Sequence, residues 1–464
     1  MAPDLPNEIW NTIFSNLEAC KYYQLPPLCE ELKRQTLRSL CLVSRRIGNL
    51  AREALYRNIA IGDGIRGPEQ SLLLTQTLAS NPKLGLATRA INIYDTMWVH
   101  YMYENPEPRM KQLFESLRLP CHLKDLLEAD RITSGGCYSH FLPVIILALV
   151  PNVRFVQLVI PPGEHKALLW MLGGECIESQ DKDKAKAGLS SRRLAANYLV
   201  NLEEVRLTER DFHLPGASAV RIVDSLLSHP NIKKLRLGKF NFTGWMIENG
   251  VFPGHQSNLR ELYFGRGFVE HRYLRHILSR CRDLRILEFK HVTYCQAPYE
   301  LSPEPGLLTF GDTLGDYAQN LVSLRLNGVC DYPTCAKKCT IGSLRQLKRL
   351  RHLTVHKSLL VGTGENRLPL AAALPLSLET LELRFESCRI LDPEDLYEEN
   401  DELFRLVSGG QFPHFRRLEY DRQPGDKFTK TIEGWTVQHE NGDPNWSTKL
   451  VLNRQDYRIC IKSA

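Results

Sequence analysis

The sequence predicts an α/β fold in which a short N-terminal helical module precedes an irregular solenoid of short parallel strands alternating with helices. Two observations carry this prediction. Apolar residues recur at helical spacing over residues 5–59, and from residue 153 a short apolar motif occurs nine times in a chain of 464 residues. With 43% hydrophobic and 24% charged residues, the composition is that of a globular protein. A collagen-like, coiled-coil or fully disordered chain is therefore excluded.

The first expected helix lies within residues 5–17. Pro6 suits a first helical turn because its φ is already fixed near the helical value. Apolar residues four apart share one helix face. This face consists of Ile9, Ile13 and Leu17, widened by Trp10 and Phe14.

A second helical pattern runs from Leu37 to Leu55, with most of its arginines off the apolar stripe. A segment rich in Pro, Cys and Tyr, residues 19–35, separates it from the first helix. From the pattern alone, a small helical bundle that only caps the rest of the chain is as good an interpretation as a partner-binding module. The stripe consists of Leu37, Leu40, Val43 and Ser44, Ile47, Leu50 and Ala51, and Ala54 and Leu55.

Together, these residues resemble an F-box motif, in the version common in filamentous-fungal F-box proteins. The resemblance covers about residues 5–59, and it departs from the family because the stretch between Leu17 and Leu37 is longer than the usual linker. It rests on Leu5-Pro6-x-Glu8-Ile9, Ile13 and Leu17, then on Leu40-Cys-Leu-Val43-Ser44-Arg45-Arg46 and Leu50-Ala51-x3-Leu55-Tyr56-Arg-x-Ile59.

The resemblance implies binding to a partner protein. F-box modules dock on a small Skp-type adaptor, which joins them through a cullin to a cullin–RING ubiquitin ligase. A short helical unit cannot bury all its apolar residues internally, and leftover apolar surface of this kind marks a partner site. Matched residue by residue, the adaptor-binding candidates are Leu5, Pro6, Ile9, Ile13, Leu40, Val43 and Ser44.

The repeated motif has the form L-x-x-L-x-L, and its starts lie 25 to 49 residues apart. Its last two apolar positions alternate with period two, which predicts a strand. Helix-like patterns lie between the strands, for example at 220–227 and 273–278. A strand plus a helix in about 25–30 residues is typical of a leucine-rich repeat, whose units bury their leucines by stacking. The predicted strand pairs are Val156/Leu158, Val205/Leu207, Leu235/Leu237, Leu262/Phe264, Leu287/Phe289, Leu324/Leu326, Leu353/Val355, Leu381/Leu383 and Leu418/Tyr420, with an earlier copy possible at Ile91/Ile93.

The repeat departs from the family pattern after the strand core. The consensus has Asn or Cys three residues later, where this chain has residues such as Phe240, Gly267 and Val292. We therefore expect irregular turns and an imperfect solenoid. The predicted organisation is a helical module at 1–60, a repeat domain at 61–420 with an insertion near 161–193, and a capping segment at 421–464.

In a leucine-rich repeat, the strand residues between and after the buried pair line the concave face. Acids and bases alternate along this face, whereas a nucleic-acid groove would need a basic excess to neutralise phosphates. The face is therefore expected to bind a target protein, with complementary charge setting specificity. The target-binding candidates are Arg206, Lys234, Arg236, Tyr263, Arg325, His352 and Arg384.

Residues 337–351 contain six Lys or Arg residues and no acid. A solvated helix between repeats is the preferred interpretation. The alternative is a site for an anionic ligand such as a phosphorylated peptide, because arginine clusters suit phosphate.

Two fragments suggest enzyme chemistry, but neither is complete. The cysteines Cys330, Cys335 and Cys339 precede two histidines, yet His352 and His356 fall on a predicted strand about 13 Å apart, so at most one could join them on a zinc ion. Gly135-Gly-Cys137-Tyr, with His140, resembles a cysteine-protease nucleophile region, but the rest of that pattern is missing. We expect no catalytic residue, metal or cofactor, and a zinc or thiol enzyme is only a third alternative.

The expected compartment is the cytoplasm or nucleus. The first residues are acidic, with no Lys or Arg before Lys21, which does not fit a secretory signal. The most apolar run, residues 141–150, is too short to span a membrane. The sequence therefore predicts a non-catalytic substrate-recognition subunit of a Skp–cullin–F-box ubiquitin ligase, binding neither nucleic acid nor membrane. The alternative is an adaptor-independent leucine-rich-repeat scaffold.

Overall fold

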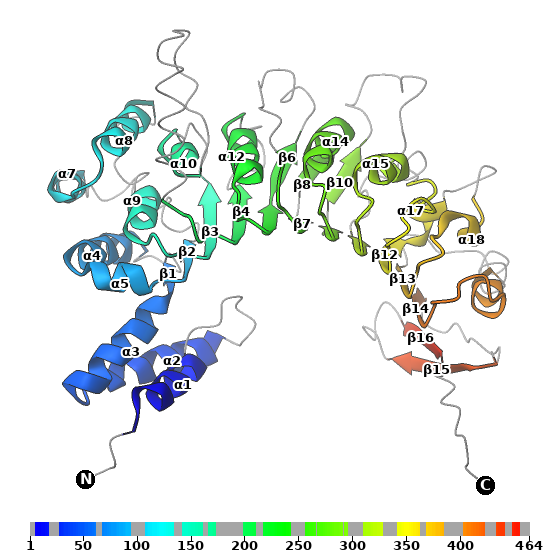
Figure 1. Ribbon diagram of the computed structural model, residues 1–464, viewed down its shortest axis with the longest axis horizontal. Coiled ribbons are helices and arrows are strands. Elements are labelled where there is room, and N and C mark those ends of the chain that lie inside the picture. Colours follow the sequence, from blue (N-terminus) through cyan, green and yellow to red (C-terminus); the bar gives the residue numbers. More distant parts are fainter. Residues whose placement is uncertain are drawn as a thin grey trace. The chain divides into compact units, whose positions relative to one another are not determined.

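The chain forms two compact units, Met1–Leu235 and Arg236–Ala464. Apart from the first three helices of the chain, the helices of each unit lie on one side of its strands (Figure 1). The structure is a computed structural model, and it describes residues 5–17, 27–61, 67–93, 107–133, 142–160, 166–172, 198–209, 217–242, 256–265, 267–290, 292–295, 310–327, 341–361, 368–384, 402–422, 433–440 and 448–454.

The first unit begins with a helical module, defined as the helices α1 (Asn7–Leu17), α2 (Pro27–Leu40) and α3 (Arg45–Arg57). The first expected helix is confirmed as α1. The second pattern is not one helix: a turn at 41–44 divides it between α2 and α3. Ser44 marks the start of the second of these helices. Its Oγ accepts a hydrogen bond from the Ile47 backbone N–H at 3.2 Å and caps the N-terminus of α3.

A small core holds the module together. It consists of Phe14, Leu37, Ala51 and Ala54, and the Trp10 ring stacks on Phe14 with centroids 5.6 Å apart. The module is built into the first repeats, because α3 runs directly into strand β1 and packs against α5.

Four parallel strands follow in the described part of the first unit, in the order β1-β2-β3-β4. Their apolar residues are in register, with Ile91 opposite Val156 and Val156 opposite Val205. The possible early copy at Ile91/Ile93 is therefore a strand, whereas β1 was not expected. The bounds are β1 (Asn58–Ile61), β2 (Ala90–Ile93), β3 (Phe155–Ile160) and β4 (Glu204–Glu209), with α4 (Gly67–Ser80), α5 (Pro82–Ala87), α7 (Glu107–Ser116), α8 (Cys121–Thr133), α9 (Leu142–Leu149), α10 (Lys166–Met171) and α12 (Ala217–Ser228).

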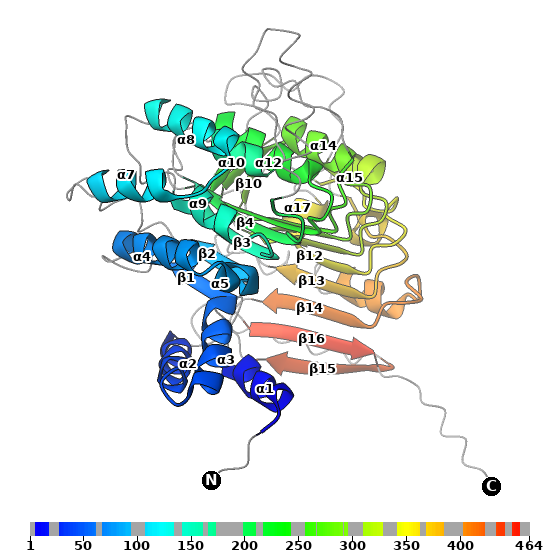
Figure 2. The ribbon, with the colours of Figure 1, turned by 60° about the vertical axis from the view of Figure 1, so that its left-hand side comes forward.

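The second unit repeats this pattern more regularly. Its strands lie in the order β7-β9-β11-β12-β13-β14-β16-β15, and Figure 2 shows β12 to β15 side by side. The second apolar position of each motif forms one buried row across the sheet, from Leu324 through Leu353 and Leu381 to Leu418. The parallel strands are β7 (Glu261–Phe264), β9 (Ile286–Phe289), β11 (Ser323–Leu326), β12 (His352–His356), β13 (Thr380–Arg384) and β14 (Arg417–Arg422).

All nine predicted strand pairs are confirmed as strands, including Leu235/Leu237 in β5 (Lys234–Gly238) at the boundary between the units. The helices expected at 220–227 and 273–278 are α12 and α14 (His271–Arg280). The remaining helices described in this unit are α15 (Phe310–Tyr317), α17 (Lys357–Val361), α18 (Leu370–Ala373) and residues 402–408.

The expectation of irregular turns is wrong at three positions. Phe240, Gly267 and Val292 each begin a short strand: β6 (Phe240–Phe242), β8 (Gly267–Glu270) and β10 (Val292–Cys295). These strands form a second parallel sheet, so strand pairing satisfies the backbone groups that an Asn side chain would otherwise bind. Gly267 is required there, because its φ is 152° and a Cβ would collide with the Phe240 carbonyl oxygen.

Two antiparallel strands follow the last parallel strand of the sheet. Strand β16 (Thr448–Arg454) pairs antiparallel with β14 and with β15 (Trp435–Glu440), so the last parallel strand is covered by a hairpin. The strand-like residues after 454 lie outside the described residues. Helix α10 lies within the predicted insertion at 161–193, and the boundary between the two compact units falls inside the predicted repeat domain.

His229, just after α12, makes the stability of the first unit sensitive to pH. Burial lowers the pKa of its imidazole to about 4, although a hydrogen bond with the Leu199 backbone opposes this shift. The unfolded chain takes up a proton near pH 6.5, so stability is complete above this pH and is lost as pH falls toward 4. We expect a loss of about 3 kcal/mol over this range. Urea titrations at neutral and acidic pH should show a weaker pH dependence for His229→Gln, and an unchanged dependence would contradict the assignment.

Candidate interaction surfaces

The helical module exposes apolar side chains where the start of α1 meets the turn before α3. Arg46 joins the two, since its guanidinium donates to the Leu5 carbonyl at 3.1 Å and to the Asn7 side-chain oxygen at 2.8 Å. Beside this joint, Ile9 is 47% exposed and Val43 is 62% exposed. Exposed apolar side chains that gather on one part of a surface can form a site that a partner covers.

The adaptor-binding candidates separate into two groups. Leu5, Pro6, Ile9, Ile13 and Val43 are exposed or half-buried and available to a partner. Leu40 instead packs against the module core, and Ser44 caps α3, so both have structural roles.

Sequence reasoning missed Leu42, which is 88% exposed, and Leu32 on α2, which is 64% exposed. The signal for Leu42 was its place in an apolar run that ends in a helix-capping serine.

In the first unit, the strand face carries two of the target-binding candidates. Arg206 on β4 donates from Nη1 to the Gln157 side-chain oxygen on β3 at 3.2 Å, and its guanidinium lies 5.9 Å from the centre of the Phe155 ring. Lys234 is half-buried at the start of β5. Arg206 and Lys234 both lie on strands, and their role in target binding stays a prediction.

In the second unit, Arg236 and Tyr263 lie together. The guanidinium is 4.2 Å from the centre of the tyrosine ring, a cation–π contact. The Tyr263 hydroxyl donates to Glu261 at 2.7 Å. Burial, and then this hydrogen bond to a carboxylate, raise the pKa of Tyr263 well above its usual value. This phenol therefore stays protonated and acts as a donor.

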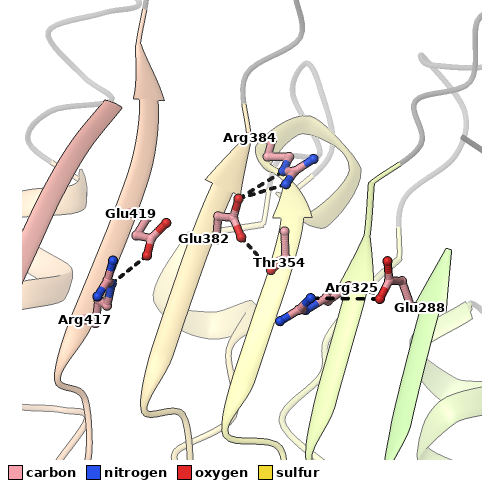
Figure 3. A network of polar contacts seen from close by, with 7 residues as sticks. All are labelled: Glu288, Arg325, Thr354, Glu382, Arg384, Arg417 and Glu419. Atoms are coloured by element: carbon pink, nitrogen blue, oxygen red, sulfur yellow. Dashed lines mark hydrogen bonds and ion pairs between the residues drawn. The ribbon is translucent and has the colours of Figure 1, made fainter. Parts of the chain in front are cut away.

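A row of polar side chains crosses β9, β11, β12, β13 and β14 (Figure 3). Strand register places Glu288 opposite Arg325, and Thr354 opposite Glu382. Glu382 accepts hydrogen bonds from the Thr354 hydroxyl at 2.9 Å and from Arg384 at 3.0 Å. The sequence had indicated alternating charges on this face, but not that they pair with one another.

Further pairs complete this row. Arg325 lies 4.0 Å from Glu288, and Arg417 donates from Nε to Glu419 at 2.6 Å. His352, at the start of β12, is exposed, and its Nδ1 is 2.8 Å from the Thr380 hydroxyl. We call the strand face that carries these residues, on β9 to β14, the charged face.

In the described part of the basic segment at 337–351, the arginines are exposed and each contacts a different partner; Arg351 pairs with Glu379 at 3.4 Å. Arg345 donates to the Ala371 carbonyl, and Arg349 donates to the Asn320 side chain. The expected helix is absent from residues 341–351, which form turns.

The end of the second unit has an open pocket of about 570 Å³ whose lining includes Phe412, Phe415 and Trp435. Trp435 and Phe415 face each other there with ring centroids 5.8 Å apart. Arg454 lines the pocket, but its Nη1 already donates to the carbonyls of Pro413 and Phe415. Its guanidinium thus helps to hold β16 in place.

The fragments that suggested enzyme chemistry cannot be located. Residues 134–140, with Cys137, and 328–340, with the cysteines of the zinc pattern, lie outside the described residues. Within the described part of the chain, no group of three or more His, Cys, Asp or Glu residues could hold a metal ion. None of the helices described there is both long and apolar enough to cross a membrane.

No protein-family model matches this chain, and no curated protein matches it. Among solved structures, a chain in the yeast complex of Rad7 and Elc1 aligns with 83% of this chain and with 91% of its own length. The identity is 13% and the TM-score is 0.29, values too low to establish a common fold or function.

Proposed function

We propose that this protein is a non-catalytic substrate-recognition subunit of a Skp–cullin–F-box type ubiquitin ligase. Its helical module would bind a Skp-type adaptor and, through it, a cullin. The strand face of the repeats would hold a target protein for ubiquitin transfer by other subunits, in the cytoplasm or nucleus.

The observation that carries this proposal is the exposed apolar surface of the helical module. The sequence of α1 to α3 resembles an F-box, and the candidates Ile9 and Val43 are exposed beside the joint made by Arg46. Trp10 and Phe14 instead pack in the module core. The module therefore has a buried apolar set, and an outer set that includes Ile9 and Val43. The outer set would be covered when the adaptor binds.

A second candidate function is an adaptor-independent scaffold, in which the module only caps the repeats. The continuity of α3 with β1, and the hydrogen bond from the Thr88 hydroxyl to the Tyr56 carbonyl, favour this alternative because they join the module firmly to the repeat.

Co-purification with the Skp-type adaptor of the host distinguishes the two functions. The variant Ile9→Asp/Val43→Asp should lose about 2 kcal/mol or more of binding, about thirty-fold, because a charge replaces an apolar anchor at each site. The matched control is Leu73→Asp/Leu86→Asp, whose leucines are 59% and 49% exposed outside the module. If the wild-type protein does not bind the adaptor, or the control loses as much binding as the variant, the receptor function is wrong.

A further inference from the structure

The ion pairs of the charged face are built asymmetrically. The Glu288 side chain is 19% exposed and that of its partner Arg325 is 56% exposed. For Glu419 and Arg417, the values are 16% and 45%. Glu382 and Arg384 differ in the same direction. The carboxylates therefore lie close to the sheet, and the guanidinium groups project toward solvent.

Local bonding explains the asymmetry. Glutamate is short, and the carboxylate of Glu382 is held by Thr354 and Arg384 at strand level. Arginine is longer and carries five N–H donors, so one contact leaves most of them unused. In the described part of the chain, both Nη atoms of Arg417 and the Nε of Arg325 have no hydrogen-bond partner.

We propose that the charged face binds an extended acidic segment of a partner protein, whose carboxylates contact Arg325, Arg384 and Arg417. This inference rests on the proposed role of the strand face as the target site, and it adds the chemistry of the target. An approaching partner meets unused guanidinium donors first, and these bind carboxylates in charge-assisted hydrogen bonds.

The arginines are offset both across and along the strands. Neighbouring strands are about 4.8 Å apart, which places β13 roughly 10 Å and β14 roughly 14 Å from β11. Strand register puts Arg325 level with Glu382 and Glu419, so Arg384 lies two residues further along the strand direction and Arg417 two residues back, about 7 Å each way. The Cα atoms of the three arginines are therefore roughly 12–16 Å apart. An extended peptide covers this distance in about four or five residues, and the long, flexible arginine side chains widen the range of acids that each guanidinium can reach.

A nucleic acid fits this face less well. Its phosphates repeat at short, regular intervals, and some would lie against the carboxylates of Glu288, Glu382 and Glu419, which are as numerous as the arginines. A protein segment can place its acids opposite the arginines and uncharged residues opposite the glutamates. The charge pattern therefore favours an acidic peptide.

The direct test measures fluorescence anisotropy of a labelled peptide of alternating Glu and Ser, titrated with the full chain. The Arg325→Gln/Arg417→Gln variant should bind at least about ten-fold more weakly. Binding should also weaken as salt is raised from about 50 to about 500 mM. The control variant, Arg282→Gln/Arg405→Gln, changes net charge equally at exposed arginines off the strands and should bind like the wild type. This control is needed because the net charge of +6 could attract the peptide elsewhere.

A variant with the opposite expected sign excludes misfolding as the cause. Glu288→Gln removes a carboxylate that forms a long ion pair of 4.0 Å with Arg325. Because this carboxylate would repel an acidic peptide, the variant should bind the peptide a few fold more tightly. Weaker binding by this variant would overturn the proposal. Equal binding of a Lys/Ser peptide would also overturn it, as would an equal loss in the Arg282→Gln/Arg405→Gln control.

Two further probes identify the class of partner. If a single-stranded oligonucleotide binds more tightly than the Glu/Ser peptide, and Arg325→Gln/Arg417→Gln weakens it, the face is a nucleic-acid site and the proposal is wrong. A phosphoserine version of the peptide should bind in the same way, and the same variant should weaken it. Adaptor co-purification of this variant should be unchanged. If the wild-type protein binds the peptide but does not bind the adaptor, the proposed ligase function is wrong and this inference still holds.

Discussion

Replacing Leu353 by alanine should lower the free energy of unfolding of the second unit by about 2–5 kcal/mol. Leu353 is 1% exposed at the centre of β12, where it lies in register with Leu324 on one side and Leu381 on the other. Alanine would leave a cavity in a row of leucines that neighbouring parallel strands cannot close without losing register. Urea unfolding followed by circular dichroism measures the change.

His352→Ala is the matched control, because it changes the preceding residue of the same strand, whose side chain is exposed. Its effect on stability should stay within about 0.5 kcal/mol. If the two substitutions cost the same free energy, β12 does not have Leu353 on its buried face. The register of the whole row would then be wrong.

The row of buried leucines from Leu324 to Leu418 is the part of the fold that could be predicted most fully from the sequence. Alternating apolar residues fix which side of a short strand is buried, and a repeated L-x-x-L-x-L sets the register of each strand on the next. Every predicted strand was found for this reason. The second sheet could not be found in this way, because β6, β8 and β10 contain only three or four residues each and are stabilised by pairing with one another.

The charged face was predictable in composition and not in geometry. Alternation placed Arg325 and Arg384 on the exposed side of their strands, and the structure places them there. Pairing depends on which strand lies beside which, and β11 meets Glu288 only because β9 is its neighbour. The exposure of an arginine relative to its glutamate depends on side-chain length and local hydrogen bonds, which a pattern of residue types does not contain.

Replacing Phe14 by alanine should unfold the helical module while leaving the repeats folded. Phe14 is 1% exposed and is the largest side chain of the module core, whose other members are Leu37, Ala51 and Ala54. Loss of a buried phenylalanine costs about 3–5 kcal/mol. A module with so small a core cannot absorb this loss, because small units bury too little surface for a large reserve of stability.

Amide hydrogen exchange measures the result segment by segment. Exchange in α1 and α2 should approach the unfolded rate, whereas the amides of β11 to β13 should stay protected. Adaptor binding should be lost together with the protection of the module, since the exposed residues Ile9 and Val43 are positioned only while the helices are packed.

Ile13→Ala is the comparison on the same helix. Its side chain is 37% exposed, so module protection should change little, whereas adaptor affinity should fall if the outer side of α1 is covered by the adaptor. If Phe14→Ala leaves α1 protected, the module is stabilised by contacts outside its own core, such as those of α3 with α5. The module would then be the first layer of the solenoid and not a separate folding unit, and the scaffold function would gain support.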